Sequence, residues 1–106
     1  MLGDGARAVL DFRVAVETGA AVLAAERAAP SDLDRLDDLT DKMNAAVEFD
    51  DYRRADVRFH IGVAEASGSA RLVAAMTEVQ GQMSDLIALI AIPGRCCGPP
   101  TSSTGG

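Results

Sequence analysis

Residues 52–60 read Tyr-Arg-Arg-Ala-Asp-Val-Arg-Phe-His, and the last of them, His60, is the only histidine of the chain. Asp56 lies four positions before His60, so on a helix the two side chains lie one above the other on the same face. Such a pair can offer a metal ion an imidazole nitrogen and a carboxylate oxygen, but a zinc-type site needs about three or four protein ligands. The same spacing also fits an ordinary carboxylate–imidazolium pair.

Apolar residues recur at spacings of three and four in four successive segments, which predicts helices. The expected helices cover residues 4–29, a segment that starts after Ser31 and includes Val47, residues 51–66 and residues 69–92. Ser31 is the expected N-cap of the second helix, and Gly68 the residue just after the third. No segment alternates with period two for long enough to indicate a strand. Because the connections are short, we expect an all-α, antiparallel bundle.

Composition narrows the class of protein. The chain has 106 residues, of which 48% are hydrophobic but only 4% aromatic, so its core should be aliphatic. Its net charge is −6, which argues against direct nucleic-acid binding. No run reaches the roughly 20 apolar residues of a membrane span, and the start lacks a signal peptide. We therefore expect a cytoplasmic protein that does not bind membranes, and we interpret Arg53, Arg54 and Arg58 as a solvated face.

The end of the chain differs in kind from the rest. Residues 94–106 are rich in Gly, Pro, Ser and Thr, a composition that predicts disorder. Cys96 and Cys97 lie in this tail and are interpreted as free thiols, since neighbouring cysteines rarely bridge without strain. We expect one helical domain over residues 1–93, followed by a disordered tail.

Several stretches together resemble one family. Residues 11–17, Asp-Phe-Arg-Val-Ala-Val-Glu, and residues 24–28, Ala-Ala-Glu-Arg-Ala, look like the first helix of the FadR-type C-terminal effector (FCD) domain of GntR-superfamily bacterial transcription regulators. Residues 54–60 resemble the family's Asp-x-x-Phe-His signature, and residues 64–68 its following Ser-Gly turn. The resemblance runs from about Ala8 to Ile92.

The resemblance implies a fold and a site. The family domain is a bundle of about six or seven helices whose interior pocket often holds a divalent metal, such as zinc, and a small organic acid. Asp56 and His60 would correspond to its first two metal ligands. Arg13 would reach the effector carboxylate, although an exposed ion pair with Glu17 is the plainer interpretation.

The chain also departs from the family pattern. The family's later ligands are histidines, and no histidine follows His60. We also expect the family's DNA-binding domain to be absent. We therefore expect a truncated domain of about four helices with an incomplete metal site. Read in a shifted frame, residues 95–106 could encode Val-Leu-Arg-x-Ser-Asn-x-x-His-Arg, which resembles the family's continuation. A frameshift near residues 93–95 is the corresponding hypothesis, and sequencing the flanking DNA tests it.

These observations favour a non-enzymatic, ligand-sensing fragment of a GntR/FadR-type regulator that binds a small carboxylate, with impaired metal binding. Truncation would expose apolar stripes on the third and fourth helices, which predicts a homodimer. The alternative is a small helical dimerisation or interaction protein, or a non-functional remnant.

Overall fold

A computed structural model describes residues 3–90 as four helices. Their bounds are α1 Asp4–Arg27, α2 Pro30–Ala45, α3 Phe49–Ala66 and α4 Ala70–Ile90. The all-α prediction is confirmed, since no strand occurs between residues 3 and 90. The predicted tail, with Cys96 and Cys97, and the expected end of the fourth helix lie outside the described residues.

The start of α2 differs from the sequence-based expectation. The helix begins at Pro30, with Ala29 rather than Ser31 at the N-cap. Pro suits the first helical position because its missing N–H would have no helical partner there. The Asp32 carboxylate accepts a hydrogen bond from the Ala29 N–H at 2.9 Å, which replaces the expected serine cap. The prediction of Ser31 as the N-cap was therefore wrong.

The turn between α3 and α4 follows the prediction. Gly68 has a φ of 76°, in the left-handed region that favours glycine after a helix. Ser69 then caps α4, because its hydroxyl oxygen accepts a hydrogen bond from the Leu72 N–H at 3.2 Å. Ser67 is buried in the same turn, where its hydroxyl donates to the Ala64 carbonyl. Both hydroxyls therefore have structural partners.

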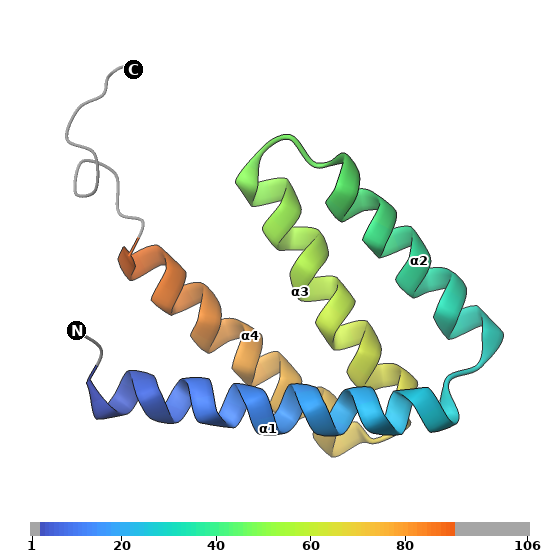
Figure 1. Ribbon diagram of the computed structural model, residues 1–106, viewed down its shortest axis with the longest axis horizontal. Coiled ribbons are helices and arrows are strands. Elements are labelled where there is room, and N and C mark those ends of the chain that lie inside the picture. Colours follow the sequence, from blue (N-terminus) through green and yellow to red (C-terminus); the bar gives the residue numbers. More distant parts are fainter. Residues whose placement is uncertain (1–2, 91–106) are drawn as a thin grey trace.

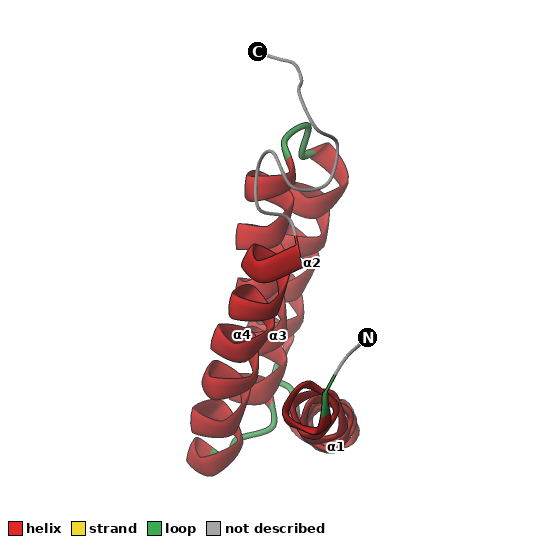
Figure 2. Ribbon diagram, turned by 90° about the vertical axis from the view of Figure 1, so that its left-hand side faces the viewer, coloured by secondary structure: helices red, strands yellow, loops and turns green. Residues whose placement is uncertain are grey.

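The helices form an antiparallel layer with one crossing helix. α3 lies between α2 and α4, and these three alternate in direction (Figure 1). α1 packs across α3 and α4 without contacting α2, and Figure 2 shows it nearly end-on beside the upright helices. The sequence did not indicate this crossing. The linker between α1 and α2 has only two residues, 28 and 29, and linkers of that length usually join antiparallel neighbours. The Arg27 guanidinium donates to the Ser67 carbonyl at 3.0 Å and so ties the end of α1 to the α3–α4 turn.

The core is small and lies where α1 crosses the layer. Its buried members come from α1, α3 and α4: Val16, Ala20, Ala64, Met76 and Val79. The alanines allow the backbones to approach closely, and Met76 is fully buried. On the other side of α3, α2 contributes the buried Leu39. No helix within residues 3–90 combines the length and the apolar character needed to cross a membrane.

Candidate functional site

Asp56 and His60 lie side by side on α3 and face α1. The His60 Nε2 atom lies 3.2 Å from Asp56 Oδ1. The other ring nitrogen, Nδ1, lies 3.7 Å from the Glu17 Oε2 atom of α1. The imidazole is therefore held between two carboxylates from different helices. The pairing within α3 follows from the spacing of four residues, whereas the approach of Glu17 depends on how α1 crosses the layer.

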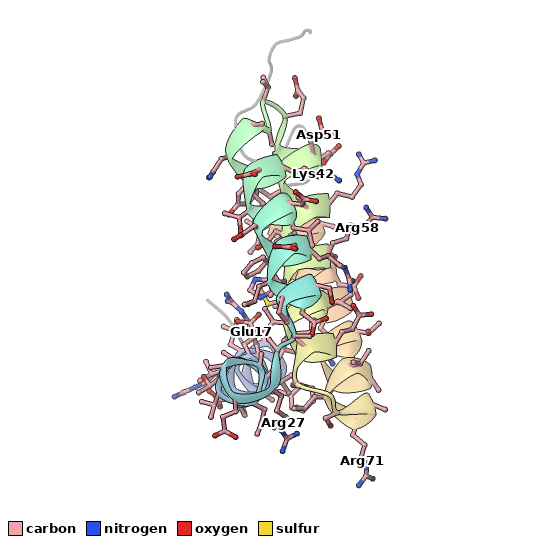
Figure 3. All side chains as sticks on the ribbon, turned by 90° about the vertical axis from the view of Figure 1, so that its right-hand side faces the viewer. Glu17, Arg27, Lys42, Asp51, Arg58 and Arg71 are labelled. Carbon is pink, nitrogen blue, oxygen red and sulfur yellow. The ribbon has the colours of Figure 1, made fainter. Side chains whose placement is uncertain are left out.

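Glu17 is the contact point between α1 and the site. Its Oε1 atom pairs with the Arg13 Nε atom at 3.3 Å. Its Oε2 atom accepts a hydrogen bond from the Gln80 Nε2 atom of α4, also at 3.3 Å. Figure 3 labels Glu17 on the side of α1 that faces the other helices. One carboxylate thus contacts side chains from all three helices that meet at the site.

Arg53 completes the network, and its role contradicts the expectation of a solvated face. Its side chain is only 15% exposed. Its Nη1 atom donates to Asp56 Oδ2 at 2.7 Å and to Gln80 Oε1 at 3.1 Å. Its Nη2 atom lies 3.4 Å from the Gln80 carbonyl oxygen and 3.4 Å from the Ser84 Oγ atom. The interpretation of Arg53 as a surface residue was therefore wrong.

The other two arginines of the cluster behave as expected. Arg54 is 75% exposed at its side chain and pairs with Asp51 at 3.6 Å. Arg58 is exposed, and it extends away from the helices in Figure 3. The sequence could not separate Arg53 from these neighbours because its partners Gln80 and Ser84 follow it by 27 and 31 positions.

These side chains border a cavity of about 160 Å³ between α1, α3 and α4. Its lining residues are Arg13, Glu17, Phe49, Tyr52, Arg53, Asp56, His60, Gln80, Met83 and Ile87. The lining thus combines two guanidinium groups, two carboxylates and one imidazole with aromatic and aliphatic walls. The Arg53 side chain borders this cavity, and among the described residues its buried Nε–H has no hydrogen-bond partner.

The same lining supplies only part of a metal site. Asp56 and His60 present an oxygen and a nitrogen 3.2 Å apart, a separation that permits both to bind one ion. However, within residues 3–90 no group of three or more His, Cys, Asp or Glu side chains is arranged to hold a metal. Because a zinc-type site needs about three protein ligands or more, the described residues do not fit a complete one.

Comparison with known families assigns the chain. The family model described as the FCD domain matches residues 8–96, which includes every residue that borders the cavity. No curated protein and no solved structure gave a match. The match covers most of the chain and agrees with the all-α architecture. The chain therefore belongs to the FCD domain family, the FadR-type effector-binding domain of GntR-family transcription regulators.

Proposed function

We propose that the chain binds a small carboxylate effector in the cavity between α1, α3 and α4. The observation that carries this proposal is that two guanidinium groups, those of Arg13 and Arg53, border one cavity. Among the described residues the buried Arg53 Nε–H has no hydrogen-bond partner. A buried donor without a partner is unfavourable, and a carboxylate oxygen would satisfy it with a charge-assisted hydrogen bond. A volume of about 160 Å³ suits a small organic acid better than a drug-sized ligand.

Arg13 is the second residue proposed to bind the effector. Its Nε atom is engaged by Glu17, and its side chain is 41% exposed. Among the described residues its two terminal nitrogens have no partner, so they are available to a carboxylate. Guanidinium groups bind carboxylates through two parallel hydrogen bonds. Arg13 and Arg53 therefore provide donors from two different helices around one cavity.

The test is calorimetric titration with a panel of small mono- and dicarboxylates, each compared with its uncharged amide. We expect binding of at least one acid and none of its amide. Arg13→Gln should weaken binding about tenfold, as expected for a lost hydrogen bond to a charged group. Arg58→Gln, which removes an exposed arginine outside the cavity, should leave binding unchanged. Equal binding of acid and amide, or equal effects of the two substitutions, would contradict the proposal.

Asp56 and His60 are the residues proposed to hold a divalent metal. Glu17, close to His60 Nδ1, would orient the ring for this role, as carboxylates commonly do for histidine ligands. With only two protein ligands among the described residues, this chain should bind zinc weakly. Zinc titration of the unaltered chain and of His60→Ala tests this expectation of weak binding. Zinc binding with a micromolar or lower Kd that disappears in His60→Ala would contradict it.

We further propose that the domain is a homodimer. Nine large apolar side chains are exposed on the described helices and their connections: Phe12, Val14, Val22, Leu33, Val47, Phe49, Tyr52, Leu89 and Ile90. Burying some of them between two copies would lower the apolar area in contact with water. Sedimentation velocity over a range of concentrations tests this, and a single monomer species throughout would refute it.

Three further properties are proposed for the chain, which concern nucleic-acid binding, location and catalysis. Because its net charge is −6, we propose that it does not bind nucleic acid directly. Because it belongs to a family of transcription regulators, we propose that it acts in the cytoplasm. We also propose that it is not an enzyme. The hydroxyls of Ser67 and Ser69 already have structural partners, since Ser67 donates to the Ala64 carbonyl of α3 and Ser69 accepts from the Leu72 N–H of α4. An electrophoretic mobility assay with the purified chain and DNA tests the proposal that it does not bind nucleic acid directly.

A further inference from the structure

We propose that the Arg53 guanidinium takes the place of a metal ion in this cavity. It supplies the positive charge that a bound carboxylate requires, so that carboxylate binding does not need a metal. The part of this inference that concerns the ligand rests on the proposed function. The part that concerns Asp56 does not, because it follows from contacts already present within the protein.

The first observation is that Asp56 already has partners on both oxygens. Oδ2 accepts the 2.7 Å bond from Arg53, and Oδ1 lies 3.2 Å from His60 Nε2. The distance of 2.7 Å is typical of the strong, charge-assisted hydrogen bonds of a guanidinium. Asp56 is 21% exposed and Arg53 15% exposed at the side chain, so the pair is little screened by water.

The second observation is that Arg53 is fixed from α4 as well as from α3. Gln80 is 3% exposed, and its side-chain oxygen and carbonyl oxygen both lie within hydrogen-bonding distance of the guanidinium. Removing Arg53 from Asp56 to admit an ion would therefore also disturb Gln80. A divalent ion bound to Oδ1 with Arg53 in place would lie close to a like charge, which weakens its binding.

The third observation concerns the donors that remain for a ligand. A carboxylate that binds through a metal needs an ion held by several protein ligands, and residues 3–90 provide no group of three. The cavity is instead bordered by the guanidinium groups of Arg53 and Arg13. Among the described residues the buried Arg53 Nε–H and the terminal nitrogens of Arg13 have no hydrogen-bond partner. The chemistry of the lining thus matches an anion directly. The ligand class is a small carboxylate recognised by two guanidinium groups.

The claim that carboxylate binding needs no metal is tested by calorimetry. The carboxylate of the panel that binds most tightly is titrated into the protein in EDTA and then in excess zinc. We expect the two affinities to agree within about twofold, whereas Arg53→Gln should lower affinity by about tenfold or more. Arg53→Lys keeps the charge but not the fork of donors, and should give an intermediate loss. Loss of binding in EDTA, or unchanged binding in Arg53→Gln, would overturn the inference. Circular dichroism and thermal melting establish that each variant is folded.

Zinc alone tests the Asp56 part without any effector, with the His60 ring followed by NMR. Arg53→Gln frees Asp56 Oδ2 and removes the positive charge, so zinc affinity at His60 should rise about tenfold or more. Arg53→Lys and Arg58→Gln should not raise it. Failure of Arg53→Gln to raise zinc affinity would overturn the claim that Arg53 occupies the cation position. If no carboxylate binds the unaltered chain with or without zinc, the proposed function fails, while this titration still decides the role of Arg53.

Discussion

The Gln80 Oε1 atom accepts a hydrogen bond from Arg53 over 3.1 Å, so a buried amide on α4 is fixed by a cation on α3. The same amide donates its Nε2–H to Glu17 of α1 at 3.3 Å. A neutral amide can accept a hydrogen bond from a guanidinium and donate one to a carboxylate at the same time. Gln80 therefore joins all three helices that border the cavity.

Replacing Gln80 with methionine should destabilise the fold. Gln80→Met keeps the length of the side chain but removes both contacts, so we expect the free energy of unfolding to fall by about 1–3 kcal/mol. Urea denaturation measures this from the midpoint, provided that the slope is unchanged. Gln82→Met on the same helix removes only a 3.4 Å contact with Glu78 and should change stability by less than about 0.5 kcal/mol. Equal losses in the two variants would contradict the bridging role of Gln80.

Removing the charge of Glu17 should strengthen carboxylate binding. Glu17 pairs with Arg13 at 3.3 Å and therefore competes with an effector for that guanidinium. In Glu17→Gln this competition and the repulsion between like charges are lost, so affinity should rise about two- to fivefold, the scale of a partly exposed ion pair. Calorimetric titration measures the change, and Asp11→Asn, an exposed acid on the same helix, is the control. A fall in affinity would show that Glu17 supports the effector rather than competing with it.

Gly81 is a position where the chain is less stable than it could be. It is exposed within α4, and a Cβ atom there would have no neighbour within 4 Å. Gly81→Ala should therefore stabilise the fold by about 0.5–1 kcal/mol through helix propensity alone. Thermal melting should show a higher midpoint, and a lower one would indicate that the exposed face of α4 has a partner.

Gly62 is the opposite case, because a side chain there would meet the Leu36 side chain of α2. A Cβ atom at Gly62 would lie 3.0 Å from the Leu36 Cδ2 atom of α2. Gly62→Val should cost about 1–3 kcal/mol by forcing this contact apart. Gly81→Val, matched in residue type but open in space, should cost nothing. Similar melting temperatures for the two valine variants would contradict the close approach at Gly62.

The sequence predicted those features that depend on neighbours along one helix. The Asp56–His60 pair and the left-handed Gly68 both follow from local spacing or local conformation. The start of α2 was misjudged because Ser31 and Asp32 are both plausible capping groups, and the Asp32 carboxylate has the bond to Ala29.

The features that the sequence did not predict depend on which helices meet. Arg53 resembles Arg54 in sequence, and only its contact with Gln80 of α4 distinguishes the two. Glu17 likewise approaches His60 because α1 crosses α3, and they are far apart along the chain. Such contacts follow from packing between helices, for which a single sequence holds no direct signal.

Helix α2 is attached to the described part of the fold through α3 alone. Among the described residues α2 packs against neither α1 nor α4, and it contributes no side chain to the cavity. A helix held by one neighbour can unfold separately at a lower free-energy cost than the helices at the centre of the fold. The backbone amides of α2 should therefore exchange with solvent deuterium before those of α3 and α4. The binding cavity can then persist through local opening of α2, so substitutions on α2 can alter lifetime in the cell without altering what the domain recognises.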